Sequence, residues 1–281
     1  MRGTAPRHCQ DPPMTPQALL THLDNGQLWS HPPSEAAGFD NAHAYQQALA
    51  VRRLREQRGE QPRGFKIGFT NRTIWPLYQV YAPIWGTVWD STLRLCEGEG
   101  RLSLDATCQP RLEPEVVFGL ASTPPRAANL QAVFESIDWI APGFEVVQSH
   151  LPDWKFQASD TIADSGLHAR LLVGPRVPLR DIASIAANAV ELDALLAGMT
   201  LRLLRDQTEV ARGNGSHVLD SPLRALHHFV QELRACPGAP DLKPGDVITT
   251  GTWTDAFPIA SGEQWTADFP APLSQLQLTL D

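Results

Sequence analysis

Two glutamates in the segment LEPEVVFGL have the spacing of a metal-binding pair. Glu113 and Glu115 are two residues apart in a stretch that is otherwise mainly apolar. On a β-strand, residues at i and i+2 project from the same face, about 6.5–7 Å apart, so both carboxylates can reach one ion. Two like charges in apolar surroundings are costly unless they are paired or metal-bound. The alternative is a solvated strand face, on which acidic residues at this spacing are common.

A third glutamate, Glu145, follows in a second strand-like segment, GFEVVQS, between Phe144 and Val146. No His or Cys lies near any of the three glutamates in the sequence. Three carboxylates without softer ligands predict an oxygen-only site. Such a site suits Mg²⁺ or Mn²⁺, with Ca²⁺ as an alternative, better than Zn²⁺.

Sequence periodicity predicts the elements that position these glutamates. Thr15 and Pro16 have the pattern of a helix N-cap and first turn, and this helix should run to about Asp24. A longer helix is expected from Asn41 to near Gly59. In GFKIGFT, apolar and other residues alternate as in a half-buried strand. Further strands are predicted near 112–120, 143–149, 168–173, 199–205, 246–250 and 274–280, and further helices over 127–139 and from 221 onward.

These elements favour an α+β fold. Strands outnumber helices after residue 63 and do not alternate regularly with them, which indicates a mixed or mainly antiparallel sheet rather than a doubly wound fold. The length of 281 residues allows one large domain or two smaller ones. Residues 1–14 lack the apolar region of a signal peptide and are predicted to be a disordered lead-in.

Composition restricts the possible partners. The net charge of −8, with 42% hydrophobic and 19% charged residues, is typical of a globular protein and argues against a broad nucleic-acid-binding face. No apolar run is long enough for a membrane span. Four scattered cysteines without a CxxC motif favour reduced thiols and a cytoplasmic location; they are Cys9, Cys96, Cys108 and Cys236.

Several segments, in order, resemble the 2-oxopent-4-enoate hydratase and 4-oxalocrotonate decarboxylase family of the fumarylacetoacetate hydrolase superfamily. They are GFKIGFT at 64–70, LEPEVVFGL at 112–120, PGFEVV at 142–147, DWKFQASDTIAD at 153–164 and GDVITTG at 245–251. The resemblance covers about residues 15–280. It implies a mixed β-sheet rolled into a distorted barrel, a smaller N-terminal helical part, and a homo-oligomer. The expected domains are a lead-in at 1–14, a helical part at 15–62 and a metal-binding, catalytic, β-rich domain at 63–281.

The resemblance implies a divalent-metal-dependent lyase with Glu113, Glu115 and Glu145 as the ligands. Its substrate would be a 2-hydroxy-dienoate or a related short 2-oxo acid. The metal would hold the carboxylate and the neighbouring oxygen and stabilise an enolate during water addition, as in a 2-keto-4-pentenoate hydratase. This makes the expected enzyme a hydro-lyase or a carboxy-lyase. The alternatives are decarboxylation of an oxalocrotonate-type acid, C–C hydrolysis of an acylpyruvate, and a non-catalytic homologue that binds metal and ligand.

Further site residues follow from the matched segments. Lys66 matches the family's lysine in the Lys-Ile-Gly segment and is expected to hold the substrate carboxylate or to transfer a proton; the alternative is a solvated strand lysine. Lys155 is a candidate second catalytic cation. Asp160 is expected to act in catalysis and Asp164 in substrate binding, with loop capping as the alternative for each.

The sequence also departs from the family pattern. Hydratases of the family commonly carry two acids where this chain has Tyr81 and Ile84, in YAPIWG. Near the C-terminus, GTWTDAF replaces a turn of small residues, and we expect Thr252 and Trp253 to bind the substrate. The segment 75–89 contains five aromatic residues. It predicts an aromatic wall that includes Tyr81 and Trp85, with a core or a subunit interface as the alternative.

Overall fold

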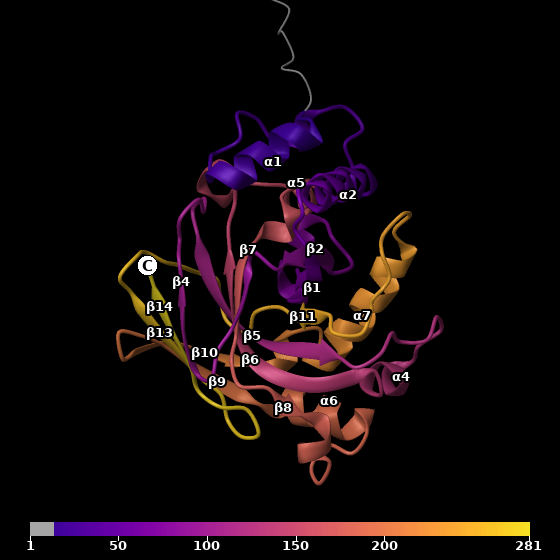
Figure 1. The fold of residues 1–281 in the computed structure, drawn as a ribbon, viewed down its shortest axis with the longest axis vertical. Coiled ribbons are helices and arrows are strands. Elements are labelled where there is room, and N and C mark those ends of the chain that lie inside the picture. The colour runs from indigo at the N-terminus through magenta and orange to yellow at the C-terminus, as the bar shows by residue number, and fades with distance from the viewer. Residues whose placement is uncertain (1–13) are drawn as a thin grey trace, which may run out of the picture.

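The computed structural model describes residues 14–281 and has an α+β fold built on two β-sheets (Figure 1). The predicted mixed, curled sheet is confirmed. The predicted lead-in at 1–14 lies almost wholly outside the described residues. Within residues 14–281, none of the helices is both long and apolar enough to cross a membrane.

The larger sheet has nine strands, in the order β2-β1-β11-β5-β6-β7-β3, with β12 beside β5 and β8 beside β6. It is mixed, because β1 pairs in parallel with β11 and β3 pairs in parallel with β7, whereas the other pairs are antiparallel. The strands are β1 (Pro62–Gly68), β2 (Ile84–Trp89), β3 (Leu93–Leu95), β5 (Arg111–Leu120), β6 (Ile137–Val147), β7 (His168–Val173), β8 (Val177–Pro178), β11 (Val247–Thr249) and β12 (Phe257–Pro258).

The smaller sheet has five strands in the order β10-β9-β13-β14-β4. Figure 1 shows it at the side of the molecule, next to the C-terminus. Its strands are β4 (Glu99–Leu102), β9 (Thr200–Arg205), β10 (Thr208–Asn214), β13 (Gln264–Asp268) and β14 (Leu276–Leu280).

In Figure 1, helices lie above the larger sheet and along its right and lower sides. As predicted, the first helix begins after Thr15, whose side chain accepts a hydrogen bond from the Ala18 amide. The first two helices share a hydrophobic cluster with residues of α5 and β2, so the N-terminal part does not have a core of its own. The helices are α1 (Pro16–Asn25), α2 (Asn41–Gln57), α3 (Trp75–Tyr78), α4 (Leu130–Phe134), α5 (Ala158–Ala163), α6 (Ala189–Gly198) and α7 (Pro222–Ala235).

One predicted element is wrong in its extent. The helix expected over 127–139 is only the five-residue α4, because Ile137 already begins strand β6. Spacing alone could not separate these states, since short apolar runs occur in both helices and buried strands. The pattern also did not predict α6, whose apolar residues are spread around the helix rather than forming one stripe.

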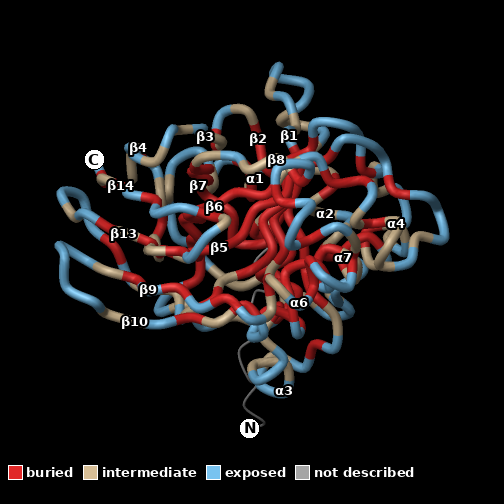
Figure 2. The backbone as a smooth tube through the Cα atoms, turned by 90° about the horizontal axis from the view of Figure 1, so that it is seen from below, coloured by how far each residue is buried: buried red, intermediate tan, exposed pale blue. Residues whose placement is uncertain are grey.

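Strands β5 and β6 form the buried centre of the larger sheet (Figure 2). On the edge of β5 that faces away from β6, the strand pairing is interrupted. β12 pairs with residues 111–112 and β11 with residues 117–119, which leaves residues 113–116 without a strand partner on that side. Pro114, which has no amide proton to donate, lies in this interruption. The interruption opens the sheet where the chain carries Glu113 and Glu115.

Candidate metal centre

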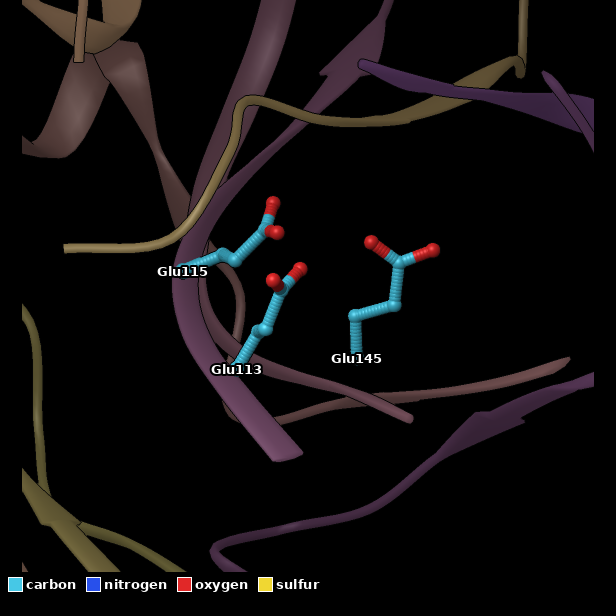
Figure 3. Close-up of side chains that lie close together, drawn as sticks. All are labelled: Glu113, Glu115 and Glu145. Atoms are coloured by element: carbon cyan, nitrogen blue, oxygen red, sulfur yellow. The ribbon is translucent and has the colours of Figure 1, made fainter. Parts of the chain in front are cut away.

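Three carboxylates converge on one point of the larger sheet. Glu113 and Glu145 are direct cross-strand partners on β5 and β6, and Glu115 is the next residue on the same face of β5. Their ligand oxygens lie within 4.8 Å of one another. Figure 3 shows the carboxylates of Glu113 and Glu115 on one side of their strand, with that of Glu145 facing them. The predicted same-face spacing therefore combines with a cross-strand pairing to form a three-oxygen site.

The hydrogen bonding of these carboxylates fits a cation. Glu115 and Glu145 are fully buried. One oxygen of Glu115 accepts a hydrogen bond from the Gly251 amide at 2.7 Å, but its Oε1 has no hydrogen-bond partner, and neither has Oε2 of Glu145. Buried acceptors without partners are costly, and hard divalent cations bind carboxylate oxygens. The residues therefore suit Mg²⁺, Mn²⁺ or Ca²⁺.

Burial and mutual repulsion shift the acid–base equilibria of the cluster. Burial raises the pKa of Glu113 to about 7, although Lys66 opposes the shift. Burial, together with the charges of Glu145 and Glu113, raises the pKa of Glu115 well above its usual value. Burial would also raise the pKa of Glu145, but Lys66 and His168 hold it below its usual value. Without a metal, the cluster therefore retains protons that a divalent cation would have to displace.

Lys66 is the cation closest to this cluster in the described structure. Its Nζ lies 3.4 Å from Oε2 of Glu145, and its side chain is only 4% exposed. Burial would lower the pKa of Lys66, yet the three carboxylates together raise it. Lys66 therefore stays protonated and contributes one positive charge against three carboxylates. A divalent cation would bring the summed charge of the group to zero.

His168 fixes the orientation of the Glu145 carboxylate through a hydrogen bond. Its Nδ1 lies 2.7 Å from Oε1 of Glu145, and its Nε2 lies 2.8 Å from the hydroxyl of Thr92. Because an ionised carboxylate can only accept, Nδ1 donates and Nε2 accepts, which matches a neutral ring whose pKa burial lowers. Partners of this kind fix the orientation of a metal ligand. His168 thus holds Oε1 of Glu145, while Oε2 faces the ammonium group of Lys66.

A cavity of about 450 Å³ opens beside the cluster. Lys66 and Glu113 line it, together with Thr252 and Arg111. Aromatic rings form part of its wall: Tyr78 stacks between Phe69 and Phe156, with ring centroids 5.0 and 5.4 Å apart. A small anionic molecule with an apolar body could enter this cavity and reach the carboxylates.

Three polar residues that were predicted to act on the substrate, Lys155, Asp160 and Asp164, lie outside the cavity lining. The side chain of Lys155 is 81% exposed, and its Nζ lies 3.3 Å from Oδ2 of Asp153. Asp160 accepts hydrogen bonds from the amide and hydroxyl of Ser34, both at 2.8 Å, and from the Gln157 amide. It therefore ties the start of α5 to the N-terminal part, which is the capping alternative. Asp164 binds the amide and ring of His150.

The aromatic residues that line the cavity differ from those that the sequence predicted. Tyr81 is 79% exposed. Trp85, in β2, is buried and stacks on Tyr45 with ring centroids 4.7 Å apart. Neither residue lines the cavity. Trp253 is also buried, against Phe269, whereas its neighbour Thr252 does line the cavity. The core alternative given for the segment 75–89 therefore describes Trp85. Trp253, which was predicted to bind the substrate, is likewise turned into the core.

Several residues of the site escaped the sequence analysis. Tyr78 belongs to the aromatic segment and Ile74 directly precedes it, but no pattern marked them as residues that reach the cavity. Trp154 reaches it because Asp153 and Trp154 have left-handed backbones, with φ of 58° and 60°. His168 carried a weak signal, since it lies in SGLHAR at 165–170, a segment in which the family commonly has small polar residues.

A histidine–aspartate pair is present but lies apart from the cavity. Nδ1 of His150 is 2.6 Å from Asp164, and both residues are buried. Trp29 stacks on the His150 ring with centroids 5.8 Å apart. His150 is not among the residues that line the cavity. The pair therefore does not face the cavity that lies beside the glutamate cluster.

We predict that metal affinity depends on pH. Because the pKa of Glu113 is raised to about 7, a proton must leave before the metal binds at lower pH. The dissociation constant for Mg²⁺ should fall about tenfold between pH 6 and pH 8. Titration calorimetry in buffers of different ionisation enthalpy would measure both the affinity and the released proton. Equal affinity at pH 6 and pH 8, without proton release, would contradict the prediction.

The contribution of Glu113 to the stability of the metal-free protein should fall as the pH rises, whereas the metal affinity should increase. The folded-state pKa of Glu113 lies above its ordinary value of 4.5, so the folded state binds the proton more tightly than the unfolded state. The resulting stabilisation is complete below pH 4.5 and is lost as the pH rises through about 7. Thermal melts of Glu113→Gln and the wild type, both without metal, should diverge over this range, with the variant becoming relatively more stable.

Comparison with known proteins agrees with this architecture. Residues 91–276 match the family model described as fumarylacetoacetate (FAA) hydrolase C-terminal. The chain is 30% identical to 2-hydroxyhexa-2,4-dienoate hydratase from Comamonas testosteroni over 225 residues, which are 79% of this chain and 80% of that protein. It is 29% identical to a 4-oxalocrotonate decarboxylase from Pseudomonas sp over 87% of this chain and 90% of that protein.

The fold is also found among solved structures. The structure of 4-oxalocrotonate decarboxylase from Pseudomonas putida G7, complexed with magnesium and adipate, superposes with a TM-score of 0.80 at 23% identity over all of both chains. A second structure of that enzyme contains calcium and acetate and gives a TM-score of 0.78. This chain therefore belongs to the fumarylacetoacetate hydrolase superfamily, in the family of the 2-keto-4-pentenoate hydratases and 4-oxalocrotonate decarboxylases.

Proposed function

We propose that this protein is a divalent-metal-dependent lyase that acts on a 2-hydroxy-dienoate or a related short 2-oxo acid. The observation that carries the proposal is the convergence of Glu113, Glu115 and Glu145 beside the protonated Lys66, at the wall of a cavity. The hydratases and decarboxylases among its relatives support this choice of chemistry.

Each residue of the site has its own role in this proposal. The three glutamates would hold Mg²⁺, Mn²⁺ or Ca²⁺, which when bound supplies Lewis-acid stabilisation of negative charge on the 2-oxo oxygen. Nζ of Lys66 attracts the substrate carboxylate and carries a proton that can be given to the substrate. Thr252 offers a hydroxyl at the cavity wall. The stacked rings of Phe69, Tyr78 and Phe156 exclude water from the apolar part of the substrate.

The reaction has two stages in this proposal. A proton is first added at the far end of the dienol while the proton of the 2-hydroxyl group leaves, which gives an α,β-unsaturated 2-oxo acid. Water then adds across the double bond, with its hydroxyl at the carbon β to the ketone and its proton at the α carbon. Loss of CO₂ from an oxalocrotonate-type acid is the alternative reaction at the same site.

The assay of this proposal uses the purified protein with Mg²⁺ and, separately, with Mn²⁺ or Ca²⁺. Freshly generated 2-hydroxypenta-2,4-dienoate and 4-oxalocrotonate are followed by the loss of ultraviolet absorbance, and the products are identified by mass. A 4-hydroxy-2-oxo acid shows hydration, and CO₂ release shows decarboxylation. Saturable ligand binding without turnover of either acid would instead favour a non-catalytic homologue.

We also propose a cytoplasmic, homo-oligomeric protein with a helical part at 15–62 and a catalytic part at 63–281. The unpaired state of Cys96, Cys108 and Cys236 supports a reducing compartment. Exposed apolar side chains, such as Leu77 and Val190, support contacts between subunits. The net charge of −8 agrees with a small-molecule substrate and with no nucleic-acid partner.

A further inference from the structure

A second cavity, of about 260 Å³, is lined by residues of the N-terminal helices α1 and α2 and of strand β7. It shares no lining residue with the cavity beside the glutamate cluster. Its charged lining residues are Asp24, Arg55, Arg58, Glu60 and Arg170. The second cavity is therefore a separate polar site in which arginines outnumber carboxylates.

Two of these arginines are neutralised by the two carboxylates. Arg58 donates hydrogen bonds to both oxygens of Asp24, at 2.6 and 2.8 Å, and it also donates to Glu60. Arg55 donates to Glu60 as well. The charges of these four residues sum to zero. Arg170 therefore gives the lining a surplus of one positive charge.

Arg170 has no carboxylate partner in the described part of the chain. Its guanidinium donates only to the backbone carbonyls of Ala169 and Asp105, at 2.9 and 2.8 Å. A guanidinium has five N–H donors, so most of its donors stay unused. Burial and the positive charges of Arg55 and Arg94 lower the pKa of Arg170, although Asp105 opposes the shift. An anion in the second cavity would offset this repulsion.

Gln148 supplies another unused donor to the second cavity. It lines the cavity, yet it is only 3% exposed. Its Oε1 accepts a hydrogen bond from the Cys108 amide at 3.0 Å, which leaves the Nε2 group for a ligand. Nε2 has no hydrogen-bond partner among the described residues. Since a nearly buried donor without a partner is costly, this amide indicates a ligand that accepts hydrogen bonds.

We propose that the second cavity binds a small inorganic oxyanion, such as phosphate or sulfate. Nε2 of Gln148 and the unused N–H groups of Arg170 are all donors, which suits a charged ligand that accepts hydrogen bonds. The surplus positive charge disfavours a cation and favours an anion over water. The volume of about 260 Å³ is below the usual range of drug-sized ligands, so it favours an oxyanion without a large organic part. The site does not depend on the proposed function.

The test is calorimetric titration of the Mg²⁺-loaded, full-length protein with sodium sulfate and, separately, with sodium phosphate, at constant ionic strength set with chloride. The wild type should bind one anion per chain. Gln148→Glu should weaken this binding about 10-fold or more. In that variant one carboxylate oxygen can still accept the hydrogen bond from Cys108, whereas the negative charge repels the anion and competes for Arg170. Arg170→Gln, which removes the surplus charge, should weaken binding to a similar extent.

Arg111→Gln is the matched control, because it removes a cation from the cavity beside the glutamate cluster instead. It should leave the affinity for both anions unchanged. Absence of saturable binding to the wild type would overturn the proposal, and so would wild-type affinity in Gln148→Glu. A loss of binding in Arg111→Gln, with full binding in Arg170→Gln, would also overturn it, since the anion would then occupy the other cavity. Thermal melts of each variant check that it is folded.

Discussion

Replacement of Glu115 by Gln should weaken the binding of Mg²⁺ at least 100-fold and reduce turnover at least 1,000-fold, values on the scale of ligand removal from metal sites. Glu115 is fully buried, and an amide of the same shape can still accept the hydrogen bond from Gly251. The substitution therefore removes a negative charge and one ligand with little change in packing.

The stability of Glu115→Gln without metal provides the second measurement. Because burial and the neighbouring carboxylates raise the pKa of Glu115 well above its usual value, a neutral amide should make the metal-free protein at least as stable as the wild type at pH 8. Metal at 100 times its dissociation constant should stabilise the wild type by about 2.7 kcal/mol but not the variant. Thermal melts with and without Mg²⁺ measure this difference.

Glu97→Gln is the matched control, since Glu97 is exposed and outside the cluster. It should behave as the wild type in all three measurements. Unchanged Mg²⁺ affinity and turnover in Glu115→Gln would contradict the assignment of the metal centre. A variant that is unstable both with and without metal would instead show that Glu115 acts mainly in folding.

Replacement of Lys66 by Met should reduce kcat/KM by about 100- to 10,000-fold, the scale of a lost acid–base group. Its ammonium lies 3.4 Å from Glu145 and is buried, so Met of similar length should fill the space. The loss removes the positive charge that balances the carboxylates and attracts the anionic substrate. Steady-state kinetics with saturating Mg²⁺ measure the effect.

Metal affinity distinguishes this variant from the loss of a ligand. With the ammonium removed, the three carboxylates repel one another more strongly, so Mg²⁺ should bind Lys66→Met at least as tightly as the wild type. Lys243→Met, a change of an exposed lysine, should leave the kinetics unaltered. Full activity of Lys66→Met would contradict the role of the ammonium, and a parallel loss of metal affinity would make Lys66 a structural support of the cluster.

Comparison of sequence and structure shows which residues a local pattern could identify. Glu113 and Glu115 lie on one face because side chains alternate along any strand. Glu145 joins them because β6 pairs with β5 in a register that sets Glu145 opposite Glu113. A shift of one residue would have turned Glu145 to the other face. The alternation was predictable from the sequence, whereas the register that sets Glu145 opposite Glu113 was not.

Other members of the site depend on irregular backbone. The pairing of β6 with β7 changes register between Val146 and Val147, at the point where His168 pairs. This irregularity accompanies the approach of His168 to Glu145. The left-handed residues Asp153 and Trp154 turn the tryptophan ring toward the cavity while Lys155 points into solvent. No periodicity marks such positions, because they break the repeat on which prediction from a sequence depends.

The sequence by itself determined the chemical character of this protein: three acidic residues and one lysine on strand-like segments, in an acidic chain whose patterning favours α+β. Strand alternation is local, so it could be recognised without knowledge of the fold. Only the tertiary structure decided which aromatic residues face the cavity, that Asp160 caps a helix, and that Arg111 lies over the ring of Trp154. These depend on strand register, on the interrupted ladder around Pro114 and on loop conformations, all of which arise from contacts between residues far apart in the chain.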